Sequence, residues 1–237
     1  MDDPAAIAAG LAELRELDPK RMIFGASTHD HALRAPVDPA LLARVEDTVG
    51  MPLPEDHRAF LTAVGDGGPG PYYGLIPLAE AVERVSDAWG ASVLGADNPL
   101  TGDVDFGEVL GRPADWDEHV ALLEADPAYA AGYDRLEAEY LDEPWCNGRL
   151  PLADHGCGDW YFLMLRGPRR GTVWVDSVVG ATGLYCLEVG FLTWYGRWLD
   201  DALHRVAAGE FAPVDAEYSF LRHGDNPRYR VVPPAGS

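Results

Sequence analysis

The residues of this chain best suited to catalysis are His155 and Cys157, within the run His155–Trp160. A catalytic cysteine needs a thiol whose pKa is lowered by a helix N-terminus or by a neighbouring imidazolium. Cys157 precedes an apolar run typical of a strand, so no helix dipole acts on it. No third group that would orient His155 is evident in the sequence. The pattern therefore favours a tight glycine turn with a small buried thiol, and a hydrolase or transferase using this pair remains an alternative.

Two further clusters could bind a cation. His29-Asp30-His31 is half of a metal site in type and spacing, but no third ligand cluster accompanies it. Asp103 and Asp105 stand in a Gly-rich loop, where a solvated turn explains them better than a cation does. The glycine-dense loop Gly65–Gly70 lacks the Lys-Ser/Thr that a phosphate-binding loop requires. We therefore predict neither a metal site nor a cofactor.

The charge balance bears on the partner. Against 18 basic residues the chain carries 39 acidic ones, a formal net charge of −21. Phosphate backbones and anionic membrane surfaces would be repelled, which argues against nucleic acid and membrane as partners. A basic protein partner is favoured, and plain solubility explains the charge equally well.

The bulk composition predicts a protein of the cytoplasm. No run approaches the roughly 20 apolar residues that span a bilayer. The start of the chain, Met1-Asp2-Asp3-Pro4, is acidic and lacks the apolar core of a secretion signal. The three cysteines form no paired framework and no Cys-x-x-Cys spacing. A reducing compartment is the simplest expectation.

The elements that must position these residues centre on a hairpin. Trp160–Leu165 is a short apolar and aromatic run, Gly167–Gly171 supplies a turn, and Thr172–Asp176 is a second β-branched and aromatic run. Two such runs around a Gly-bounded loop predict an antiparallel hairpin. Since the first run is apolar at nearly every position, its strand should be central, with both faces covered.

Helical periodicity and capping residues predict the covering helices. Further strands are expected over Pro71–Ile76, where an internal glycine indicates a bulge or a close contact, and over Gly183–Val189. The expected helices are Pro4–Leu17, Pro39–Val49 after an Asp38 N-cap, one from Leu53-Pro54 to a stop at Gly65, Ala79–Trp89, Trp116–Glu124, Tyr129–Leu141 and a closing helix from Phe191, while Gly90–Pro113 is expected to be loop.

Three blocks of the sequence, in this order, resemble the SUKH superfamily (Smi/Knr-like domain). Leu53–Leu78, LPEDHRAFLTAVGDGGPGPYYGLIPL, is similar to its opening motif. Arg149–Asp176, with its Gly-Cys-Gly approach and Gly-x-Val-Trp strand, is similar to the second block, and Phe191–Leu203 to the closing helix. The blocks cover a little over half of the chain. Residues 90–148 depart from the family pattern, and we interpret them as a helical insertion.

The fold class expected from these patterns and the resemblance is α+β. It comprises an antiparallel-rich sheet of about five strands covered by helices, with a helical insertion at about 90–148. We expect a single SUKH-like domain over residues 1–209, followed by a C-terminal tail, 210–237, that is partly docked.

The resemblance implies a protein-binding module without catalytic activity. Many bacterial SUKH members are immunity proteins that neutralise a polymorphic toxin, often a nuclease, whereas fungal relatives regulate cell-wall synthesis through protein contacts. An immunity protein acting on a basic toxin domain is therefore the first hypothesis. A regulatory scaffold of the cell-wall-regulator type is the second, and the enzyme using His155 and Cys157 is the third.

We expect the working surface to be acidic and assembled from loops beside the sheet. Tyrosines are frequent energetic anchors of protein interfaces. An ordinary strand or turn role is at least as good an explanation for any one of the candidates. The candidate contact residues are Asp66, Tyr72, Tyr73, Asp103, Asp105, Asp154 and Asp159.

Overall fold

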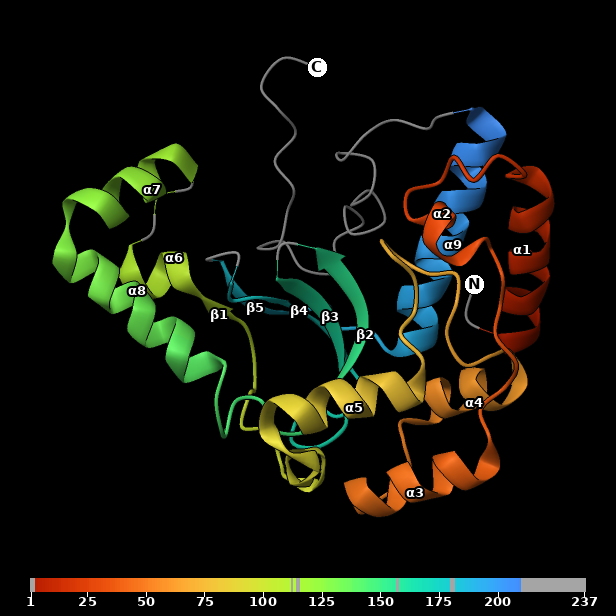
Figure 1. The fold of residues 1–237 in the computed structure, drawn as a ribbon, viewed down its shortest axis with the longest axis horizontal. Helices are drawn as coiled ribbons and strands as arrows, with labels where there is room; N and C mark the ends of the chain where they lie inside the picture. Colours follow the sequence, from red (N-terminus) through yellow and green to blue (C-terminus); the bar gives the residue numbers. More distant parts are fainter. Residues whose placement is uncertain (1–2, 112, 114–115, 157, 180–181, 210–237) are drawn as a thin grey trace.

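The computed structural model describes residues 3–111, 113, 116–156, 158–179 and 182–209, and it is an α+β fold, as predicted (Figure 1). The strands are β1 Val104–Asp105, β2 Arg149–Gly156, β3 Asp159–Met164, β4 Val173–Ser177 and β5 Gly183–Cys186. The helices of this described part are α1 Pro4–Leu17, α2 Ala26–His29, α3 Pro39–Val49, α4 Glu55–Ala63, α5 Leu78–Trp89, α6 Phe106–Leu110, α7 Trp116–Ala125, α8 Pro127–Tyr140 and α9 Phe191–Ala208, with a 3-10 turn η1 at Ala91–Gly95.

The five strands form one antiparallel sheet in the order β1-β5-β4-β3-β2. The predicted hairpin is confirmed, with Phe162 of β3 opposite Trp174 of β4. β3 lies between β2 and β4, so it is an interior strand. The strand expected at Gly183–Val189 is shorter, ending at Cys186.

Both faces of β3 are covered, as its uninterrupted apolar sequence predicts. Side chains of a strand alternate between the two faces of its sheet. Tyr161 and Leu163 belong to the larger core on one face, and Phe162 and Met164 to a second core on the other. In Figure 1, α9 and α1 stand on one side of the sheet and α6 to α8 on the other.

The larger core is built around α9. Its aromatic stripe is buried, and the Trp194 ring lies 5.0 Å from the Tyr161 ring of β3, which confirms that the closing helix packs against the hairpin. Phe60 of α4 packs against Phe191 and Tyr195 at 5.1 and 5.0 Å. The most extensive neighbour of α9 is α1, so the helix is held between α1, α4 and the sheet.

Local capping explains where the first helices begin and end. Asp38 accepts a hydrogen bond from the Ala40 amide at 2.8 Å at the start of α3. Gly50 ends that helix in the left-handed conformation, with φ 77°. Both features follow the predicted pattern, because a short acceptor satisfies free N–H groups and glycine has no Cβ to oppose positive φ.

The segment 90–148 covers the second face of the sheet. Its two acidic helices are confirmed as α7 and α8, and Tyr133 and Leu136 of α8 join Trp174 and Leu184 in the second core. The expectation of an unbroken loop before them is wrong.

That stretch instead forms η1, the edge strand β1 and α6. β1 pairs with β5, where Val104 lies opposite Leu184. A two-residue strand has too few residues to show alternation, so periodicity could not reveal it.

The strand expected at Pro71–Ile76 is also wrong. Tyr72 has a φ of 53° and Gly74 a φ of 102°, both incompatible with an extended strand. Only isolated bridges remain, from Leu75 to Gly68 and to Ala153 of β2. The predicted C-terminal tail, 210–237, lies outside the described residues.

Candidate protein-binding surface

Two loops from distant parts of the sequence lie side by side at one end of the fold. They are residues 21–31, which contain α2, and residues 68–76, which lead into α5. A Cβ atom on Gly25, whose φ is 76°, would collide with the Tyr72 carbonyl oxygen. The Phe24 ring lies 5.5 Å from the Tyr73 ring across the same junction. We call this junction, with Met22, Phe24 and Tyr73 at its surface, the loop face.

The loop face presents large apolar side chains to solvent. Met22 is 49% exposed, Phe24 42% and Tyr73 47%. Single apolar side chains at a surface are ordinary, but Phe24 and Tyr73 are in contact, and exposed apolar side chains that adjoin one another are typical of an interaction site. Leu17, at the end of α1 and 47% exposed, precedes this group in the chain.

The backbone of the loop face is held in unusual conformations. Five non-glycine residues of the described chain have positive φ, and four of them are here: Arg21, Asp30, His31 and Tyr72. Such conformations cost about 1–3 kcal/mol each and concentrate at functional sites. The positive φ values therefore mark the loop face as a candidate functional surface.

A buried carboxylate fixes the first loop. Asp18 accepts hydrogen bonds from the amides of Met22 (2.7 Å) and Ile23 (3.0 Å) and contacts His31 Nε2 at 2.9 Å. Burial alone would raise the pKa of Asp18, but the Ile23 and Met22 amides and His31 outweigh it and lower that pKa. An Arg21–Asp30 ion pair of 2.8 Å closes the loop at its surface. The surface positions of Met22 and Phe24 are thereby set by a rigid frame.

The His29-Asp30-His31 motif therefore has a structural role. His31 is buried against Asp18, and the pKa of His29 is lowered to about 4 by burial and by the neighbouring His31. Within the described residues, no group of three His, Cys, Asp or Glu side chains is placed to hold a metal ion.

A hollow of about 470 Å³ adjoins the loop face. Tyr73 and Asp154 line it, so these two candidates from distant parts of the sequence come together. Glu80 and Arg84 of α5, paired at 2.7 Å, line its other side. The hollow and the exposed aromatic rings together form a surface that is partly concave and partly apolar.

Tyr72, the neighbour of Tyr73, is buried. It is 4% exposed, and its ring lies 3.9 Å from that of His155 and 6.0 Å from that of Tyr161. In this arrangement Tyr72 supports the loop from beneath, and Tyr73 is the tyrosine that a partner can reach.

The remaining candidate aspartates accept hydrogen bonds within the fold and do not gather at one place. Asp66 accepts from the Leu78 amide (2.7 Å) at the start of α5, and Asp159 from the Ser177 hydroxyl (2.6 Å). Asp103 accepts from the Cys186 amide (2.9 Å) beside β5, and Asp105 caps α6 through the Glu108 amide (3.2 Å). Asp154 itself accepts from the Gly156 amide at 2.7 Å.

His155, one of the two residues of the catalytic alternative, lies in the interior of the fold. The centroid of the His155 imidazole lies 3.9 Å from that of the Tyr72 ring and 4.3 Å from that of the Tyr161 ring. Burial lowers the pKa of His155 to about 3. Cys157 lies outside the described residues. Cys146 and Cys186 are buried, and burial raises the pKa of both thiols, the opposite of what a nucleophile needs.

Met22 and Phe24 were missed from the sequence. The available signal was a short apolar run, Met22-Ile23-Phe24, in a stretch without periodicity. Only the contact between the two loops turns them into part of a surface. Among the described helices, none is long and apolar enough to cross a membrane.

The comparison with protein families matches the SMI1/KNR4 family (SUKH-1) over residues 36–185, more than half of the chain. The chain belongs to this family. Neither the curated proteins nor the solved structures contain a match to it. The matched range includes the second loop of the loop face, the segment 90–148 and all of the sheet except Cys186, while the first loop and α9 lie outside it.

Proposed function

We propose that this SUKH-1 protein is an immunity protein that binds and neutralises a basic toxin domain through the loop face, without catalysis of its own. SUKH domains are commonly toxin-immunity proteins. The observation that carries the proposal is the exposed group of Met22, Phe24 and Tyr73 on loops held in strained conformations. Rigid aromatic anchors lose little conformational entropy on binding, which is why they dominate protein interfaces.

Charge and apolar contact have separate roles in this proposal. The net charge of −21 acts at long range and speeds the encounter with a basic partner. The hollow is lined by both signs of charge, Glu80 and Asp154 with Arg34 and Arg84, so it adds little net field. Phe24 and Tyr73 act at short range and slow dissociation once they are buried.

The test uses the purified product of the adjacent gene as the partner and measures association and dissociation rates at low and high salt. Raising the salt should slow association and change dissociation little. Replacing Phe24 and Tyr73 together by serine should weaken binding about 100-fold, mainly through faster dissociation.

A matched control replaces two exposed apolar residues elsewhere, Val109 (55% exposed) and Val179 (43% exposed), by serine. This variant should bind like the parent. Equal losses in the two double variants would place the interface outside the loop face.

Neutralisation is tested by growth. Co-expression of this chain should rescue cells that produce the toxin domain, and the Phe24/Tyr73 variant should not. Binding without rescue, or an adjacent gene that encodes a biosynthetic protein, would favour the regulatory scaffold instead.

A further inference from the structure

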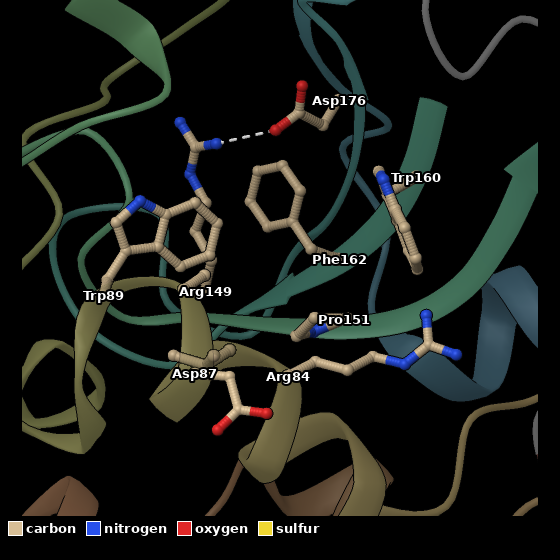
Figure 2. A pocket seen from close by; sticks show the side chains of 10 residues that line it. Arg84, Asp87, Trp89, Arg149, Pro151, Trp160, Phe162 and Asp176 are labelled. Atoms are coloured by element: carbon tan, nitrogen blue, oxygen red, sulfur yellow. Dashed lines mark hydrogen bonds and ion pairs between the residues drawn. The ribbon is translucent and has the colours of Figure 1, made fainter. Parts of the chain in front are cut away.

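A second hollow, of about 590 Å³, lies between the C-terminal half of α5 and one face of strands β2 to β4. Its walls are mainly apolar, with Trp89, Trp160, Phe162 and Pro151 among the lining residues (Figure 2). We call it the aromatic pocket. Pockets for small ligands have this size and this character, with a few polar groups that fix orientation.

Strand alternation explains which residues line the aromatic pocket. Trp160 and Phe162 point to the second face of the sheet, and the register sets Asp176 opposite Trp160 and Pro151 opposite Phe162. In Figure 2, Trp89 and Arg149 lie on one side of the hollow and Trp160 on the other, with Phe162 between them.

Four charged residues line the aromatic pocket, Arg84, Asp87, Arg149 and Asp176, and of the two arginines Arg149 is the buried one. Its side chain is 8% exposed, its Nη1 donates to Asp176 Oδ2 at 2.8 Å, and its guanidinium lies 4.7 Å from the Phe162 ring centroid. Its Nε and Nη2 are shielded from water and have no hydrogen-bond partner within the described part of the chain.

The guanidinium nitrogens of Arg149 that lack a hydrogen bond indicate what kind of ligand this side chain can bind. Nε and Nη2 form one edge of the guanidinium, the fork that binds both oxygens of a carboxylate. Asp176 binds only Nη1, so this fork has no acceptor among the described residues. Buried charged donors without acceptors are costly, so an acceptor that reaches them is strongly favoured.

Cationic ligands are disfavoured, because arginines already lie over two of the aromatic rings. The Arg84 guanidinium stands 5.0 Å from the Trp160 ring centroid, as Arg149 does over Phe162. A second cation would have to displace one of them. An anionic group on an apolar body meets the opposite situation, since its charge is attracted by these arginines and its body needs only the apolar wall that the lining supplies.

We propose that the aromatic pocket binds a small organic acid, with its flat apolar body against the tryptophan rings and its carboxylate on the Nε–Nη2 edge of Arg149. Trp89 is the gate. At 38% exposure it is the most accessible aromatic residue of the lining, and it ends α5 just before Gly90, whose φ is 87°. Its indole N–H donates to the Leu141 carbonyl oxygen at 2.7 Å, a single tether that a side-chain turn releases. This inference is independent of the proposed immunity function.

Calorimetric titration of the full chain with phenylacetate and indole-3-acetate tests the proposal. The matched neutral amides, phenylacetamide and indole-3-acetamide, keep the body and remove the charge. The acids should bind and raise the melting temperature, and the amides should bind at least tenfold more weakly. Acids that fail to bind at millimolar concentration, or amides that bind equally well, would overturn it.

The variants must separate binding from folding. Arg149→Met alone leaves Asp176 buried without its partner and is expected to unfold the chain. The double variant Arg149→Met/Asp176→Leu removes both charges, and such apolar replacements are often neutral or stabilising. It should fold and lose the preference for acids over amides. A folded double variant that still prefers the acids would show that Arg149 is not the receptor.

The carboxylate could belong to a free acid or to the end of a peptide chain. N-acetyltryptophan and a tetrapeptide ending in tryptophan carry the same terminal group. Equal or tighter binding of N-acetyltryptophan supports the free acid, whereas much tighter binding of the peptide would overturn that part of the proposal.

Discussion

The two faces of the sheet are covered in different ways. On the first face, α9 brings Trp194, Tyr195 and Trp198 into a continuous core with α1 and α4. On the second face, α8 and Phe106 cover the part of the sheet around Trp174 and Leu184. The aromatic pocket remains over Trp160 and Phe162 on that same second face.

The difference comes from the covering segments, because the strands supply apolar side chains to both faces. α9 carries large aromatic residues at helical spacing over Phe191–Trp198, and Leu199 and Ala202 continue its buried stripe. α8 buries two residues, Tyr133 and Leu136, and the rest of the helix is mostly alanine and charged residues, with the partly buried Tyr140 at its end. A short apolar contact covers part of a sheet, and what it leaves open becomes a cavity.

The largest expected effect is on the first face. Trp194→Ala removes a fully buried ring against Tyr161 and should lower the free energy of unfolding by about 3–5 kcal/mol. Trp89→Ala, the same change at the rim of the aromatic pocket, should cost under about 1 kcal/mol, as expected for an exposed side chain. Urea denaturation measures both, and equal losses would mean that the two faces are packed alike.

Acid should also destabilise the first face, through the buried His155. Burial lowers the pKa of His155 to about 3, against 6.5 in an unfolded chain. Below pH 6.5 the unfolded state takes up a proton that the folded state does not, so stability falls as pH drops towards 3. The slope from this histidine is at most about 1.4 kcal/mol per pH unit. His155→Phe should remove it, measured by urea denaturation between pH 8 and 5.

Above pH 7 the two proteins should differ by a constant amount, because His155 is neutral in both states. An unchanged slope in the variant would show that this imidazole takes up its proton in the folded state.

The contact between α8 and the sheet should respond more weakly. The Tyr133 hydroxyl donates to the Val178 carbonyl oxygen at 3.2 Å, so Tyr133→Phe should cost about 1 kcal/mol. Tyr73→Phe, a hydroxyl removed from an exposed ring, serves as the control and should be neutral. A neutral Tyr133→Phe would mean that the second core depends on apolar contact alone.

The smallest effect on the free energy of unfolding is expected at Phe24 and Tyr73, the residues on which the proposed binding depends most. Phe24→Ser and Tyr73→Ser should each change the free energy of unfolding by no more than about 0.5 kcal/mol, because both side chains are exposed. Circular dichroism melting measures this. A large loss of stability would mean that the loop face is part of the core rather than a surface for a partner.

Much of the fold could be predicted from local sequence. The hairpin follows from two apolar runs around a glycine turn, and α1, α3 and α9 follow from apolar spacing with caps at Asp38 and Gly50. These signals depend on residues close together in the sequence, so they can be recognised without knowledge of the rest of the chain. The strand predicted over residues 71–76 was wrong because tyrosines favour strands, whereas Gly74 and the contact of Gly25 with Tyr72 are compatible only with a turn.

Of the contact residues predicted from the sequence, Tyr73 and Asp154 line the same hollow. The other aspartates are candidates by their charge alone, and charge does not distinguish a carboxylate in solvent from one that caps a helix. Asp66 and Asp105 illustrate this, since each satisfies a helix N-terminus.

By itself, the sequence determined the α+β class, the hairpin, the closing helix, the acidic charge and the resemblance to SUKH proteins, because each depends on composition or on residues close together in the chain. Only the tertiary structure decided the loop face and the aromatic pocket. Phe24 meets Tyr73, and Arg149 meets Asp176 and Phe162, through contacts between residues far apart in sequence. Long-range packing also decides which side chains stay exposed, and exposure is what makes a side chain available to a partner or a ligand.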